Sequence, residues 1–168
     1  MQTSVFVAKQ GVDERLVATR QQAWQSGAAM SQNFDYDLPR VAAFMQRFLP
    51  GLRLAEGMVA IGLVRHARLV AGVVYEGLNR HNVWMHVAAE PGARWLTRDY
   101  LRASFAYPFK VCGVERVSAH VDSSNVASRR FCGHLGFVPE ARLSTAAHDG
   151  SDVILYVMWR ADCRFLET

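Results

Sequence analysis

Residues 125–137 read Asn-Val-Ala-Ser-Arg-Arg-Phe-Cys-Gly-His-Leu-Gly-Phe, and Val-Pro-Glu-Ala follows them directly. The stretch has the parts of one short helix. Asn125 carries a side-chain oxygen that can accept hydrogen bonds from the free N–H groups at a helix start. Ala127, Phe131 and Leu135 recur every four residues and form one apolar stripe. Gly136 stands where helices end in the left-handed conformation, so a helix is predicted over Asn125–Leu135.

Strands are predicted on both sides of this helix. Before it, Arg116–Val121 alternates polar and apolar residues, as a strand with one buried face does. After it, Val138–Ala147 and Asp152–Arg160 read as two further strands. They flank His148-Asp149-Gly150-Ser151, in which the Asp-Gly pair is a strong signal for a hairpin.

The preceding part of the chain predicts alternating strands and helices. Helical spacing ends at Pro50-Gly51, and Pro108 predicts a kink or an early helix end because it cannot donate to the carbonyl four residues back. The charged turn Arg65-His66-Ala67-Arg68 predicts a hairpin. The predicted elements are strand 4–9, helix 12–26, loop 31–37, helix Leu38–Leu49, strands Met58–Val64, Leu69–Gly77 and Asn82–Ala89, and helix Thr97–Val111.

Composition limits the protein classes that remain. The chain of 168 residues fits one domain, 1–168, and its 51% hydrophobic and 20% charged residues exclude a disordered chain. No apolar run is long enough to span a bilayer, and the start has no basic lead or apolar block of a secretory signal. Three widely spaced cysteines indicate neither a zinc site nor a disulfide framework, which favours a reducing cytoplasm. The net charge of +4 suits an anionic ligand such as a nucleotide cofactor.

The order strand, Asn-led helix, Gly-Phe and strand resembles the C-terminal half of the GNAT superfamily of acyl-CoA-dependent N-acyltransferases. It is most similar to the ribosomal-protein and small-molecule branch, where N-x-x-S/A…L-G-F-x-x-E recurs. The order of elements matches across nearly the whole chain. The resemblance implies an α/β (α+β) fold: a mixed, mostly antiparallel sheet of six to seven strands, about four flanking helices, and two splayed strands that hold acyl-CoA.

The resemblance also implies acetyl-CoA as cosubstrate and no metal. In the family, pantetheine pairs with the fourth strand and the diphosphate meets the next helix start, where N–H groups attract anions. The implied contacts are Val87, Ala88, Ala89, Arg94, Trp95, Leu96, Thr97, Arg98, Asn125, Ser128 and Phe131. The chain departs from the family's glycine-rich loop at Ala93–Arg98, and one glycine is displaced to Gly92. Its Arg-Trp-Leu-Thr-Arg string resembles a variant loop of phage-encoded and prophage-encoded members; the alternative is an ordinary charged loop.

Acyl transfer to an amine needs a base, a donor for the tetrahedral oxyanion and an acid for the leaving thiolate. Many family members use a Tyr seven residues after the motif Asn as the acid, and Cys132 stands there in this chain. Ser128 is then the first candidate to stabilise the thiolate. Tyr156 is the second, with a packing role as its alternative. His86 is a candidate base and Glu90 its rival. The alternatives are a sheet histidine that faces solvent or packs under a helix, and an ordinary solvated carboxylate. Direct attack with water-mediated proton loss needs none of them.

These features predict an N-acetyltransferase that moves an acetyl group from acetyl-CoA to a primary amine by direct attack. The acceptor is a small molecule, a protein N-terminus or a lysine. Two alternatives stay open: a GNAT-fold binding module without catalysis, and a phage-type acyltransferase acting on nucleic acid or tRNA. Scattered arginines argue against a dedicated nucleic-acid binder. We expect a monomer or homodimer, away from membranes, in the cytoplasm of a bacterial or phage-infected cell.

Overall fold

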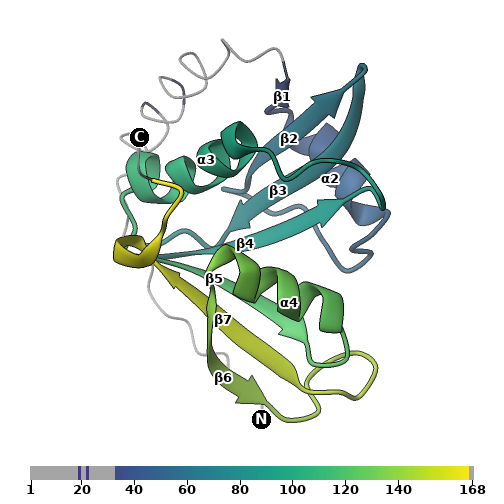
Figure 1. The fold of residues 1–168 in the computed structure, drawn as a ribbon, viewed down its shortest axis with the longest axis vertical. Coiled ribbons are helices and arrows are strands. Elements are labelled where there is room, and N and C mark those ends of the chain that lie inside the picture. Colours follow the sequence, from purple (N-terminus) through teal and green to yellow (C-terminus); the bar gives the residue numbers. More distant parts are fainter. Residues whose placement is uncertain (1–18, 20–21, 23–32, 167–168) are drawn as a thin grey trace.

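The computed structural model describes residues 33–166 together with Thr19 and Gln22. Within these residues, seven strands form one sheet in the order β1-β2-β3-β4-β5-β7-β6 (Figure 1). Only β4 and β5 run parallel, so the predicted mixed, mostly antiparallel sheet is confirmed. The strands are β1 (Phe34–Asp35), β2 (Val59–Arg65), β3 (Arg68–Glu76), β4 (Asn82–Ala89), β5 (Arg116–Asp122), β6 (Val138–Leu143) and β7 (Val153–Trp159).

Helices cover both faces of the sheet. The described residues form three α-helices: α2 (Leu38–Gln46), α3 (Arg98–Ala106) and α4 (Val126–Leu135). A π-helical segment, Tyr107–Cys112, follows α3, and a 3-10 turn, Arg160–Asp162, follows β7. Helix α2 packs on one face against β2, β3 and β4. Helices α3 and α4 contribute their buried residues to the larger core on the other face.

Helix α2 packs closely against the sheet. Its residues Val41, Ala42 and Met45 follow helical spacing and are fully buried. A Cβ atom at Gly72 of β3 would lie 2.7 Å from Cγ of Met45, so glycine is required for this approach. Asp37 caps the helix by accepting a hydrogen bond from the N–H of Arg40 at 2.8 Å. These contacts fix α2 over the first half of the sheet.

On the face of the sheet opposite α2, two buried tyrosines connect α3 with β2 and β3. The hydroxyl of Tyr75 in β3 donates to the carbonyl of Ser104, and that of Tyr100 in α3 donates to the carbonyl of Ile61 at 2.8 Å. Burial raises the pKa of both hydroxyls, so both remain protonated donors at neutral pH. The hydrogen bonds set the height of α3 above β2 and β3.

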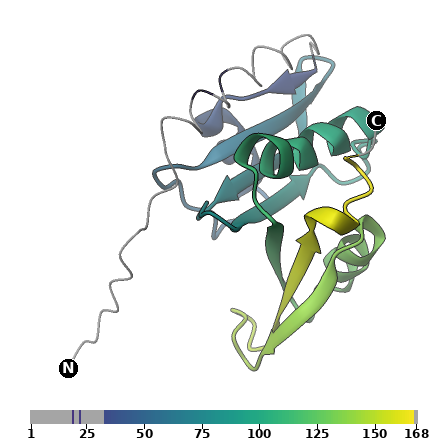
Figure 2. The same ribbon diagram turned by 90° about the vertical axis from the view of Figure 1, so that its left-hand side faces the viewer.

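Strands β4 and β5 pair only at their beginnings. The ladder joins Asn82 to Arg116, Val83 to Val117 and Trp84 to Ser118, and it then stops. Beyond it, β4 keeps its partner β3 and β5 keeps its partner β7. The two halves of the sheet therefore diverge (Figures 1 and 2). We call the gap between residues 85–89 and 119–122 the wedge; it is the splayed strand pair that the sequence predicts.

Several predicted boundaries differ from the structure. The loop predicted over 31–37 is wrong at Phe34–Asp35, which pair with β2 as β1. Helix α3 ends early, as Pro108 predicts, and the chain continues as a π-helix. Strand β6 ends before its predicted limit because Thr145 turns the chain with a φ of 53°. Helix α2 also ends before its predicted limit, at Gln46.

The predicted N-terminal elements lie mostly outside the described residues. Strand 4–9 lies wholly outside them. Of helix 12–26, the structure describes Thr19 and Gln22, and both are helical. The described part of the chain therefore supplies three of the roughly four flanking helices that the sequence predicts.

Candidate active site

Strand alternation divides the residues of the wedge between two faces. On β4, Val87 and Ala89 pack toward the core beneath α3 and α4. Trp84 and His86 alternate with them and lie on the α2 side, where Ala88 joins the smaller core. The predicted cofactor contacts in α3 and α4 and the predicted base His86 therefore occupy opposite sides of the sheet.

On the first side, two helices begin at the open end of the wedge. Helix α3 follows β4 after a short loop, and α4 follows β5. Asn125 caps α4 by accepting a hydrogen bond from the N–H of Ser128 at 3.0 Å. Thr97 caps α3 by accepting one from the N–H of Tyr100 at 3.4 Å. The caps leave further N–H groups of each first turn directed away from the helix.

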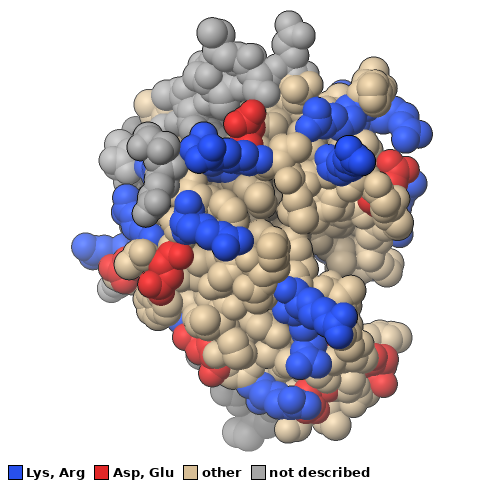
Figure 3. Space-filling view, in the orientation of Figure 1, with Lys and Arg blue, Asp and Glu red and all other residues tan. Residues whose placement is uncertain are grey.

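Cationic side chains surround these helix starts. Arg94 and Arg98 are exposed at the beginning of α3, and no described residue forms an ion pair with either guanidinium. Arg129 and Arg130 are exposed on α4. The space-filling view shows a hollow between the α3 and α4 parts of this face, with Lys and Arg side chains on both sides of it (Figure 3). The face is suited to an anion.

Two predicted cofactor residues meet between the helices. The ring of Trp95, in the loop before α3, lies 5.3 Å from the ring of Phe131 on α4, measured between centroids. Trp95 also contacts Tyr100 at 6.4 Å. Leu96 is exposed beside this pair. The variant loop thus places an aromatic ring, rather than glycine backbone, against α4.

On the α2 side, three titratable side chains converge across the wedge. Nε2 of His86 lies 2.6 Å from Oε1 of Glu76 on β3, a contact produced by the β3–β4 register. The rings of His86 and His120 lie 5.5 Å apart, although β4 and β5 no longer pair there. Enclosure, followed by the neighbouring His86, lowers the pKa of His120 below its usual range. His120 faces away from the larger core.

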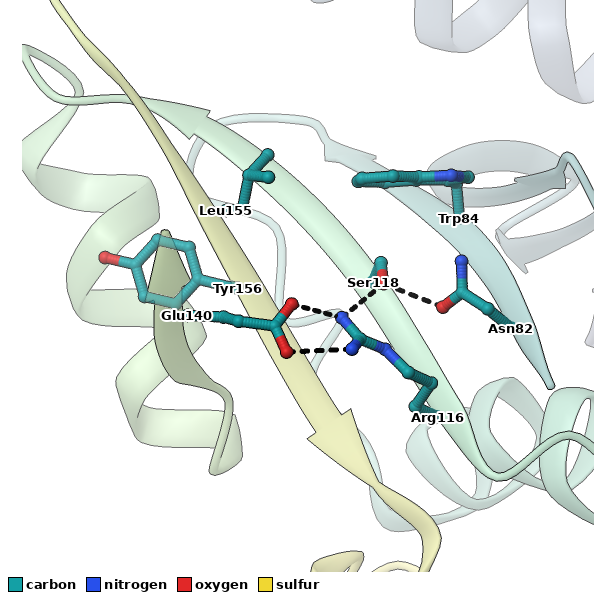
Figure 4. Close-up of a pocket in the computed structure, with 7 residues that line it drawn as sticks. All are labelled: Asn82, Trp84, Arg116, Ser118, Glu140, Leu155 and Tyr156. Atoms are coloured by element: carbon teal, nitrogen blue, oxygen red, sulfur yellow. Dashed lines mark hydrogen bonds and ion pairs between the residues drawn. The ribbon is translucent and has the colours of Figure 1, made fainter. Parts of the chain in front are cut away.

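A cavity of about 300 Å³ opens beside these groups, at the closed end of the wedge. The guanidinium of Arg116 donates to Glu140 at 2.8 and 2.5 Å, and also to Oγ of Ser118. Ser118 in turn donates to Oδ1 of Asn82 at 2.7 Å (Figure 4). This hydrogen-bonded chain holds β4, β5 and β6 together where the ladder ends. The cavity is lined by Asn82, Trp84, Arg116, Ser118, Glu140, Leu155 and Tyr156.

The other predicted catalytic residues lie apart from His86. Glu90 pairs with Arg68 and lines a separate cavity with residues of α2. Ser128 lies in the first turn of α4, on the opposite side of the sheet. Tyr156 is buried in the larger core, and its ring points away from Ser118 (Figure 4).

Sequence reasoning missed Glu76, Trp84 and the residues around Ser118. Alternation alone could have placed Trp84 on the same face as His86, and Ser118 on the same face as His120, because each pair is two residues apart in one strand.

Among the described residues, no three His, Cys, Asp or Glu side chains form a group that could hold a metal ion. No helix of the described part is long and apolar enough to cross a membrane.

Comparison with known proteins supports the fold. No family model matches the chain, and no curated protein matches its sequence. Among solved structures, a chimera of spermidine N-acetyltransferase SpeG from Vibrio cholerae and hSSAT has a TM-score of 0.62 at 12% identity, covering 80% of this chain and 99% of that one. A point mutant of the same SpeG has a TM-score of 0.57 at 13% sequence identity, covering 90% of this chain and 94% of that one. A T. thermophilus protein designated an acetyltransferase gives 0.55 at 21%, covering 70% and 67%. This chain has the fold of the GNAT acetyltransferases.

Proposed function

We propose that the protein transfers an acetyl group from acetyl-CoA to a primary amine carried by a small molecule, a protein N-terminus or a lysine. One observation carries the proposal: the β4–β5 ladder stops after Trp84 and Ser118. The strand edges beyond it are left without each other as partners, beside the starts of α3 and α4. An extended chain entering this gap can pair with strand backbone.

The side of the wedge beneath α3 and α4 is suited to acetyl-CoA. The pantetheine arm would lie along Val87–Ala89 and reach Asn125, Ser128 and Phe131. The diphosphate would meet the loop Arg94–Arg98, where the first N–H groups of α3 and two guanidinium groups free of ion pairs with described residues favour negative charge. When bound, acetyl-CoA supplies a thioester carbonyl that is activated toward an amine.

The residues of the α2 side are suited to remove a proton from the acceptor. Because the carboxylate of Glu76 accepts from Nε2–H of His86, Nδ1 of His86 is left as a proton acceptor. As the C–N bond forms and the C–S bond breaks, the amine proton passes to this imidazole directly or through water. Ser128, on the α3 and α4 side, is suited to donate a hydrogen bond from its hydroxyl to the leaving thiolate. Tyr156 is the second candidate for this role. Glu90 has no part in this scheme.

The finer predictions also belong to this proposal. The spacing of Asn125, Ser128, Gly136 and Phe137 supports kinship with the ribosomal-protein and small-molecule branch, and the Arg94–Arg98 loop supports a phage-like variant. All three cysteines are free thiols, which supports a cytoplasmic protein. We expect a monomer or a homodimer.

Calorimetric titration with acetyl-CoA, followed by an amine screen, tests the proposal. Asn125→Asp keeps an oxygen to cap α4 but loses the amide donor, and Ser128→Ala removes the hydroxyl; both should weaken saturable one-to-one binding. Ser144→Ala, on the β6–β7 loop, is the matched control. Binding without transfer to any amine would favour a binding module instead. Absence of binding to both acetyl-CoA and CoA would refute the proposed cofactor site.

A further inference from the structure

The cavity at the closed end of the wedge has a composition that selects among amines. It lies on the α2 side of the sheet, and its walls include Trp84 and Ser118, the last residues of the β4–β5 ladder. The ring of Trp84 lies 6.1 Å from that of His120, so the cavity adjoins the titratable cluster. An amine that enters from the α2 side would meet, in the wedge, a thioester that is bound from the α3 and α4 side.

The upper walls of the cavity are apolar. The indole of Trp84 and the side chain of Leu155 stand on either side of the space above Ser118 (Figure 4). Both are only partly buried, so their surfaces are available to a ligand. An aromatic ring gains more from a tryptophan face than an alkyl chain of similar length does.

The polar end of the cavity repels a second positive charge. Glu140 is the only carboxylate among the lining residues, and both of its oxygens accept from Arg116, which lowers the pKa of Glu140. Because Ser118 accepts from Arg116, its hydroxyl proton is free to donate to Oδ1 of Asn82. This fixes the orientation of the amide and turns Nδ2 of Asn82 toward Trp84 (Figure 4). An ammonium group at this end would meet donors and no unpaired carboxylate.

From this arrangement we infer that the cavity is the acceptor site and that it selects a monoamine with an aromatic body over a polyamine. The amine lies at the end of the cavity that adjoins His120, away from the polar end, and the ring lies between Trp84 and Leu155. The inference rests on the proposed acetyl transfer, and it adds the class of acceptor. A polyamine is disfavoured because its second ammonium finds no free carboxylate among the lining residues.

Three amines at saturating acetyl-CoA test this selectivity: 2-phenylethylamine, n-butylamine and spermidine. We expect kcat/KM for 2-phenylethylamine to exceed the other two by about tenfold. Trp84→Leu should remove that advantage, with little change for n-butylamine, whereas Trp84→Phe should keep most of it. Phe48→Leu is the matched control, because Phe48 contacts Phe44 of α2 and does not line the cavity. A preference for spermidine, or an equal effect of Trp84→Leu on all three amines, would overturn the inference.

A binding measurement separates this inference from the proposed function. If no amine is acetylated, the proposed transfer fails, and the cavity is then tested by ligand-observed NMR with 2-phenylethylamine. Binding that Trp84→Leu abolishes and Phe48→Leu preserves would support an aromatic-amine site. No binding, or equal competition by spermidine, would refute it.

Discussion

The imidazole rings of His86 and His120 face each other across the wedge, 5.5 Å apart and nearly perpendicular, on two strands that do not pair at that level. Oε1 of Glu76 lies 2.6 Å from Nε2 of His86, and the Glu76 carboxylate is partly open to solvent. A proton taken up at the wedge therefore has a route through His86 to a solvated carboxylate. The arrangement needs no contribution from the α3 and α4 side.

His86→Asn should lower kcat about 100-fold, because it removes the proton acceptor while keeping a side chain of similar shape. Glu76→Gln should lower kcat less, since the imidazole stays but its orientation and tautomer are no longer fixed. KM for acetyl-CoA should be unchanged in both. His134→Gln is the control, because His134 is exposed near the end of α4. An unaffected kcat in His86→Asn would show that water removes the proton.

His120 should make stability depend on pH in a defined direction. Its native pKa lies below its ordinary value of 6.5, since enclosure and His86 lower it by more than Asp122 and Glu76 raise it. As pH falls through 6.5, the unfolded chain takes up a proton before the native one does, so the free energy of unfolding decreases. Above pH 6.5, His120 is neutral in both states and its contribution to the free energy of unfolding no longer changes with pH. Urea denaturation between neutral and mildly acidic pH should show a smaller decline in His120→Gln; identical declines would contradict this.

Local signals in the sequence predict the helix over 126–135 well. Asn125 supplies the predicted cap, and Gly136 adopts a φ of 102° at the predicted end. Both signals act within a few residues of the helix, so no other part of the chain is needed to interpret them. The same is true of the β2–β3 hairpin and of the early end of α3 before Pro108.

The candidate site depends instead on pairing between distant strands. Glu76 meets His86 only because Val74 of β3 stands opposite His86, a register that a single sequence does not state. Glu90 is closer to His86 along the chain, yet it pairs with Arg68 near α2. The chain of hydrogen bonds through Arg116 likewise joins three strands. Prediction from sequence therefore gave the faces of the strands but not the partners across them.

Arg94→Gln with Arg98→Gln should weaken acetyl-CoA binding by about tenfold, because two charged donors are removed at the start of α3. The loss should shrink as salt rises, since both side chains are exposed and screened. Arg80→Gln with Arg160→Gln changes the net charge equally at exposed positions elsewhere. Titration calorimetry at low and high salt makes the comparison. Equal weakening in both double variants would point to net charge instead of a local phosphate site.

Cys132→Ala should leave kcat unchanged. Burial raises the pKa of the Cys132 thiol to about 11, so it stays protonated at neutral pH and is a poor nucleophile. The substitution should cost about 1 kcal/mol in the free energy of unfolding through lost packing. The native thiol should also react slowly with a disulfide reagent. A large loss of kcat in a folded Cys132→Ala protein would instead show that the thiol acts as the acid in place of the family's tyrosine.

Ala67→Gly should stabilise the protein by about 0.5–1 kcal/mol. The two-residue turn between β2 and β3 has positive φ at both positions, 49° at His66 and 60° at Ala67. Such turns match the twist of a hairpin but favour glycine at the second position, because a Cβ atom there crowds the backbone. Ala103→Gly, inside α3, is the matched control and should destabilise by about 1 kcal/mol. Thermal or urea unfolding measures both. Destabilisation by Ala67→Gly would mean that entropy lost on folding outweighs the strain relieved in the turn.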